Sequence, residues 1–160
     1  MRSRAAIPIF LAIMILLVSS GAGNEYIYIK DVTMHLNGDN ATFELNYTLE
    51  TFTRFYVLAL GCKYLERELL SFLGNYGDVR LIKADMNSAS LLVRGAGKYD
   101  RGYYLFDSRP LGTKNQPLKE SIDRFSVVYP QGRTRTFYNV TTTQSVSFPN
   151  ESLSNLSRRS

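Results

Sequence analysis

The sequence predicts an α+β fold, mainly an antiparallel β-sheet built from hairpins, with one amphipathic helix packed on it. Two strand-like arms, residues 26–36 and 41–50, flank Asn37-Gly38, and this dipeptide between alternating segments is a strong hairpin signal. Only residues 62–73 repeat apolar side chains at the period of a helix. The other segments are short, β-rich and divided by turn residues, an order that favours a sheet with one helix on a face.

The second arm shows the alternation most clearly. Its odd-numbered residues are apolar and its even-numbered residues are polar, from Ala41 and Thr42 to Leu49 and Glu50. Such a strand has one face on a core and the other in water. Residues 52–60 are apolar almost throughout and fit two structures. Their Phe, Tyr and Val content favours a buried strand, and a helix beginning at Thr53 stays open.

The helix over 62–73 places its apolar residues on one stripe, which we interpret as core packing. Gly74 and Gly77 then end it. Five further strands are expected, with a surface loop over 108–120 and a Pro-Gln-Gly turn between the last two strands. These strands cover residues 79–84, 88–94, 103–107, 124–129 and 133–140.

The N-terminal stretch predicts export. Two arginines precede 20 uncharged residues, 5–24, whose centre is almost continuously apolar and is followed by the small residues Ser20-Gly21-Ala22. This order is typical of a signal peptide, here residues 1–24. The same 20 residues are long enough to remain uncut as a membrane anchor. In both cases the rest of the chain is expected outside the cell or on the outer face of the cytoplasmic membrane.

Composition limits the rest of the chain to one domain. Residues 25–148 are expected to form a single α+β domain, and the Ser/Asn-rich residues 149–160 a disordered tail. Of the net charge of +5, two positive charges belong to the leader and two to the last three residues. The body is therefore nearly neutral, and without a basic cluster it is not expected to bind nucleic acid.

No catalytic or metal-binding pattern stands out, so neither an enzyme nor a cofactor is predicted. His35 is the single histidine and Cys62 the single cysteine, whereas zinc sites use several such ligands. We interpret His35 as a solvent-facing strand residue and Cys62 as a buried small apolar side chain, with pairing of Cys62 between two chains as the alternative. The Gly-Ala-Gly-Lys run at 95–98 resembles a phosphate-binding loop only superficially, because Tyr99 replaces the Ser or Thr that would hold magnesium.

Residues 98–110 combine aromatic and charged side chains most densely. Exposed tyrosines beside arginines are favoured at interaction surfaces, although the same rings also suit a core. The candidate surface residues are Tyr99, Arg101, Tyr103, Tyr104 and Arg109.

Five sequons for N-glycosylation follow the leader, at Asn40, Asn46, Asn139, Asn150 and Asn155. Asn40 and Asn46 share the polar parity of the second arm, and Asn139 lies on a polar face of the last strand. We expect these faces to be outside.

Three segments carry a resemblance to a known group of proteins. They are RFYVLALG at 54–61, GYY at 102–104 and FSVVYPQGRT at 125–134. Across residues 25–145 the pattern resembles small exported proteins of methanogenic archaea. The resemblance transfers no functional residue. It implies an archaeal cell surface, where asparagine glycosylation is common.

The sequence therefore favours a non-enzymatic surface or envelope protein that acts by binding. One alternative is an accessory subunit of a membrane complex, held by an uncleaved N-terminal helix. Another is a hydrolase whose carboxylate site has no recognisable spacing.

Overall fold

The computed structural model describes residues 27–150, and these form the expected α+β fold. The elements follow one another as β1 (Ile27–Asn37), β2 (Asn40–Leu49), α2 (Thr51–Leu60), the 3₁₀ helix η1 (Cys62–Leu65), α3 (Glu66–Phe72), β3 (Asp78–Ala84), β4 (Ser88–Arg94), β5 (Lys98–Asp100), β6 (Tyr103–Phe106), β7 (Ile122–Val128), β8 (Thr134–Val140) and β9 (Val146–Pro149).

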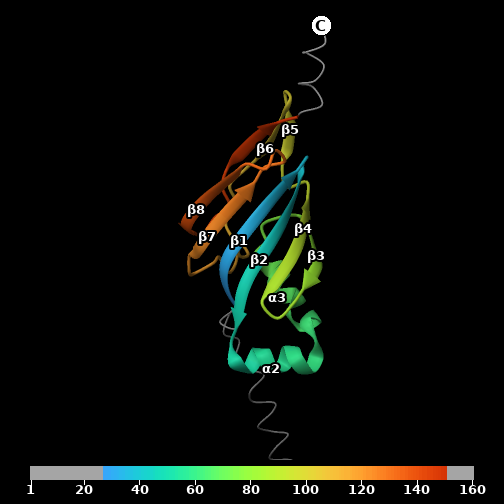
Figure 1. The fold of residues 1–160 in the computed structure, drawn as a ribbon, viewed down its shortest axis with the longest axis vertical. Coiled ribbons are helices and arrows are strands. Elements are labelled where there is room, and N and C mark those ends of the chain that lie inside the picture. The colour runs from blue at the N-terminus through green and yellow to red at the C-terminus, as the bar shows by residue number, and fades with distance from the viewer. Residues whose placement is uncertain (1–26, 151–160) are drawn as a thin grey trace, which may run out of the picture.

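The strands form two sheets. Six strands are ordered β3-β4-β2-β1-β7-β8, and three are ordered β5-β6-β9. All neighbours are antiparallel except β1 and β7, which pair in parallel from Asp31↔Arg124 to His35↔Val128. The small sheet lies at one end of the molecule and α2 at the other, across the long axis (Figure 1).

The β1–β2 hairpin confirms the sequence prediction. Asn37 pairs with Asn40, so Gly38 and Asp39 are the two central residues of the turn. Gly38 has a φ of 59°, the left-handed conformation that a II′ turn needs at its first central position and that glycine adopts without steric cost.

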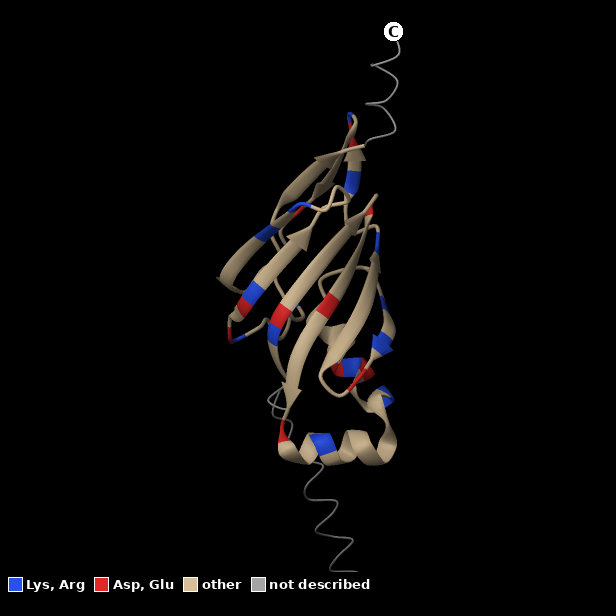
Figure 2. Cartoon of the chain, in the orientation of Figure 1, with Lys and Arg blue, Asp and Glu red and all other residues tan. Residues whose placement is uncertain are grey.

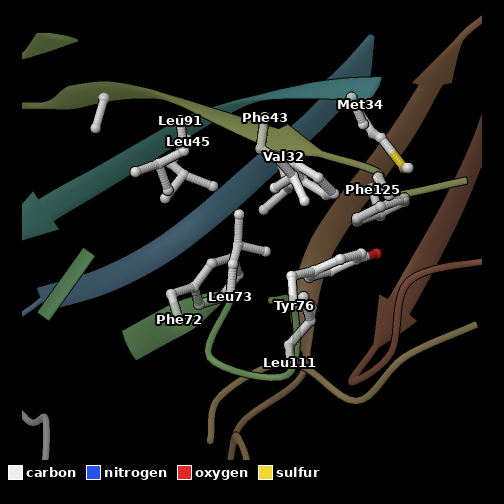
Figure 3. Packing of buried hydrophobic residues seen from close by; sticks show 14 of the residues in the cluster. Val32, Met34, Phe43, Leu45, Phe72, Leu73, Tyr76, Leu91, Leu111 and Phe125 are labelled. Atoms are coloured by element: carbon white, nitrogen blue, oxygen red, sulfur yellow. The ribbon is translucent and has the colours of Figure 1, made fainter. Parts of the chain in front are cut away.

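The core lies on one face of the six-stranded sheet. Alternate strand residues are buried there, among them Phe43, Leu45, Leu91 and Phe125. Figure 3 shows the layer that covers them: Phe72 and Leu73 from the end of α3, then Tyr76 and Leu111. The opposite face of β2 carries polar residues, as its alternation predicts.

The preferred interpretation of residues 52–60 was wrong: they form α2, the alternative left open, and not a strand. Only Thr53 and Val57, one helical turn apart, are buried in it. The helix ends where the Gly61 N–H donates to the Val57 carbonyl oxygen at 2.8 Å. Apolar content alone could not distinguish a helix from a strand here, because a short apolar segment suits both. A strand forms only where the edge of another strand is available for pairing.

The predicted helix at 62–73 is present. Its first turn is the 3₁₀ helix η1, and α3 continues it to Phe72. Leu65, Leu69, Phe72 and Leu73 are all buried, so this stripe packs in the core as expected.

Three features arise only from the fold: strands β5 and β9, and the parallel pairing of β1 with β7. Pro149, expected to begin the tail, is the last residue of β9. The predicted leader and the tail from residue 151 onward lie outside the described residues. Within residues 27–150, no helix has the length and apolar content needed to cross a membrane.

Candidate binding surfaces

The most exposed apolar area that the helices present is at α2. Six large side chains there have exposed fractions between 50% and 71%. We call this the α2 surface: Phe52, Phe55, Tyr56, Leu58, Leu60 and Tyr64. Arg54 is the single charged residue within α2, which accordingly shows one basic band and no acidic one in Figure 2.

The attachment of α2 explains why so much of it is exposed. Thr53 and Val57 face the rest of the protein, with exposed fractions of 5% and 2%. The Tyr56 and Tyr64 rings stack with their centroids 6.0 Å apart and so connect α2 to η1. A helix held through one narrow side leaves its wider side in solvent.

At the opposite end, the structure brings four of the five candidate interaction residues together on β5, β6 and their turn. The Tyr99 and Tyr104 ring centroids are 5.2 Å apart, and Tyr104 in turn lies 5.3 Å from Phe148 of β9. Arg101 and Gly102 form the turn, both with positive φ. Tyr99, Arg101 and Tyr103 are exposed, and we call these three residues the β5–β6 tip.

Arg109 has a different environment from those four. Its guanidinium lies 4.8 Å from the centroid of the Tyr76 ring, and its Nη1 donates to the Asn75 carbonyl oxygen at 2.8 Å. The Tyr76 hydroxyl donates to Thr143 Oγ1 at 3.2 Å, and burial raises the pKa of Tyr76. Arg109 therefore holds the loop around it against the core.

The sequon asparagines differ in their surroundings. Asn46 and Asn139 are exposed, whereas Asn40 is half-buried and its Oδ1 accepts the Gly95 N–H at 3.1 Å. The backbone N–H of Asn150 donates to the Gly102 carbonyl oxygen at 2.8 Å. Asn155 lies outside the described residues. Asn139 has a φ of 54°, a left-handed conformation that few residues other than glycine and asparagine tolerate.

The single histidine and the single cysteine of the described residues are both half-buried, so His35 is less exposed and Cys62 less buried than the sequence suggested. His35 Nε2 is 3.4 Å from Glu44 Oε2, and the two side chains are 42% and 60% exposed. Cys62 is half-buried beside the core. Across residues 27–150, no group of three or more His, Cys, Asp or Glu side chains is arranged to hold a metal ion.

By sequence, the glycines of the run at 95–98 favour a hairpin turn, but the run instead joins β4 of the six-stranded sheet to β5 of the three-stranded sheet. Gly95 has a φ of 60°. The Gly97 N–H donates to the carbonyl oxygen of Asp39, in the β1–β2 turn, at 2.8 Å. A Cβ on Gly97 would come within 2.8 Å of the Phe106 ring, so a glycine is required there for packing.

A largely apolar cavity of about 420 Å³ opens near the start of β1. Ile27 and Ile29 line it from β1, Leu69 and Phe72 line it from α3, and the loop at 112–121 closes one side. Because Ile27 also pairs with Leu49, this cavity lies near the start of α2.

Sequence reasoning missed the α2 surface because it assigned the segment to the core. One signal was available: residues 51–60 contain a single charged residue. The segment is therefore more apolar than a helix that buries only one side needs to be. Comparison with known proteins adds no relative, since no protein family, curated protein or solved structure matches this chain.

Proposed function

We propose that this chain is an exported protein that is held at the outer face of the cytoplasmic membrane and acts there by binding. The observation that carries the proposal is that the two ends of the molecule differ. The start of β1, which follows the apolar N-terminal segment directly, lies at the α2 end, and the aromatic β5–β6 tip lies at the other end (Figure 1).

This arrangement suits a protein that is attached at one end and presents the other. The tip combines two exposed tyrosines with an exposed arginine on a short hairpin. Tyr and Arg are enriched at the energetic centres of protein interfaces. We therefore assign partner binding to the β5–β6 tip.

The location is tested by cell fractionation with intact-mass measurement of the full chain. We expect the protein in the membrane fraction, accessible from outside, with the mass of the uncut chain. The Leu11→Arg/Leu16→Arg variant should not be exported, because each charge at the centre of such a segment costs about 2.5–3.5 kcal/mol. Export of that variant, or release of a shortened wild-type chain, would contradict the proposal.

The binding role is tested by placing a photo-crosslinking amino acid at Tyr103 in producing cells. The matched control is Tyr138 on β8, whose side chain is also exposed. We expect a discrete adduct from the Tyr103 position and none from the Tyr138 position. Equal labelling at the two positions would argue against a specific tip, and a tip-dependent adduct with a partner spanning the membrane would favour the complex-subunit alternative.

A further inference from the structure

We infer that the α2 surface lies in the headgroup region of the lipid bilayer, with α2 parallel to the membrane plane. This inference rests on the proposed attachment at the outer membrane face. It extends that proposal by giving the domain a second membrane contact and a defined orientation.

The first argument is the distance between the apolar segment and α2. The uncharged stretch ends at residue 24, and Ile27 already pairs with Leu49, two residues before α2 begins. Three residue steps span at most about 10 Å. The polar region on each side of a bilayer is roughly 5–7 Å thick. If residues 5–24 cross the membrane, the α2 end of the domain therefore has to meet the headgroups.

The second argument is the orientation of α2. The helix runs across the long axis of the molecule and forms its end (Figure 1). At 3.6 residues per turn, Phe55 projects from the side of α2 opposite the buried Thr53 and Val57, and the exposed Leu58 projects beside it. A flat surface that approaches this end meets the side of the helix and its apolar residues, not one of its termini.

The third argument is chemical. Helices that lie in a membrane interface place Phe, Leu and Trp on the face toward the lipid, and tyrosine rings are enriched at the level of the headgroups. The α2 surface has this composition: four of its six side chains are Phe or Leu and two are Tyr, and each is at least half exposed. Arg54 is long enough to extend its charge to the aqueous side.

A second copy of the chain fits this surface less well. A stable protein interface uses about 20–30 residues on each side. The α2 surface offers six large side chains on one ten-residue helix and the adjoining turn. A bilayer needs no matching shape, so a small apolar area held close by a covalent anchor is sufficient.

The test uses the full chain, reconstituted by detergent removal into phosphatidylcholine vesicles. In a Cys62→Ser background, an environment-sensitive NBD label is attached to Leu58→Cys or to Phe55→Cys, both on the exposed side of α2. The control is Ser147→Cys, an exposed residue of β9 in the small sheet at the opposite end. Vesicle flotation reports attachment, and nitroxide-bearing lipids report the depth of each label.

We expect all variants to float, most NBD fluorescence at Leu58 and Phe55 to be quenched by nitroxides near the headgroups, and the Ser147 label to be unaffected. Flotation without quenching at α2 would overturn this inference and leave the proposed attachment standing. Failure to float would overturn both. Efficient disulfide crosslinking of the Leu58→Cys variant to itself would instead assign the surface to a second copy.

Discussion

At the scale of single residues, Tyr47 shows how one side chain combines burial with hydrogen bonding. Its ring is buried on the core face of β2, and its hydroxyl donates to the backbone carbonyl oxygens of Asp85 at 2.6 Å and Ser88 at 3.2 Å. Burial, assisted by the nearby Cys62 and Asp85, raises the pKa of Tyr47 to about 12. The turn between β3 and β4 is thereby attached to the strand beside it.

This raised pKa predicts a loss of stability in alkaline solution. The folded state holds the Tyr47 proton more tightly than the unfolded chain, whose tyrosine titrates near 10. The stabilisation is therefore complete below about pH 10 and declines as pH rises through 12. Tyr47→Phe should reduce this dependence in urea unfolding between pH 8 and 11.5, and should cost about 1 kcal/mol at pH 7 through the lost hydrogen bond. An unchanged pH dependence in the variant would contradict the assignment.

Asn139 and Asn46 are both exposed sequon residues, but their backbones differ. Asn139 is left-handed with a φ of 54° in β8. Left-handed backbone costs about 1–2 kcal/mol for most residues, and asparagine tolerates it through local hydrogen bonds. Asn139 is exposed as expected, but a residue that replaces it must also adopt the left-handed backbone.

In unglycosylated protein, Asn139→Gln should lower the unfolding free energy by about 1 kcal/mol, and Asn46→Gln should change it by less than about 0.5 kcal/mol. Chemical denaturation of the two variants measures the difference. A loss of several kcal/mol at Asn46 would mean that its side chain is a buried hydrogen-bonding group, with the sheet reversed.

At the scale of elements, the two helices use the same kind of residue for opposite purposes. Leu69 of α3 packs in the core with an exposed fraction of 1%, whereas Leu58 of α2 has an exposed fraction of 68%. Periodicity identified the first because its apolar residues form a stripe. It could not identify α2, because the apolar residues of this helix project on nearly every side and form no single stripe.

This contrast predicts unequal costs for the same substitution. Leu69→Ala should destabilise the protein by roughly 2–5 kcal/mol, the cost of a cavity in a core. Leu58→Ala should stay within about 0.5 kcal/mol, as exposed positions do. Urea unfolding of both variants provides the comparison, and a large loss at Leu58 would show that the α2 surface belongs to the fold and is not free for a membrane.

At the scale of the whole molecule, the chain builds an object with two different ends. The parallel pairing of β1 with β7 joins segments about ninety residues apart, such as Asp31 and Arg124, whose side chains form an ion pair at 3.0 Å. The β6–β9 pairing closes the small sheet in the same long-range manner. These contacts set which end carries α2 and which carries the β5–β6 tip, and so define the proposed membrane and partner sides.

The sequence by itself determined the local elements and the inner faces of the strands. The β1–β2 hairpin, β4 and the helix at 62–73 lie where turn chemistry and periodicity place them, because those signals act between residues close in the chain. The sequence also determined which face of β2 is buried, because apolar and polar residues alternate along it and a shift of one residue would exchange the two faces.

Only the tertiary structure decided that residues 51–60 are an exposed helix, that β1 pairs in parallel with β7, and that Arg109 packs on Tyr76 while Tyr99 and Tyr103 face solvent. The side chains concerned suit a core or a surface equally well, and a strand edge can pair with more than one other strand. The choice depends on which distant segment covers it, and that information is spread over the whole chain, beyond the reach of any local pattern.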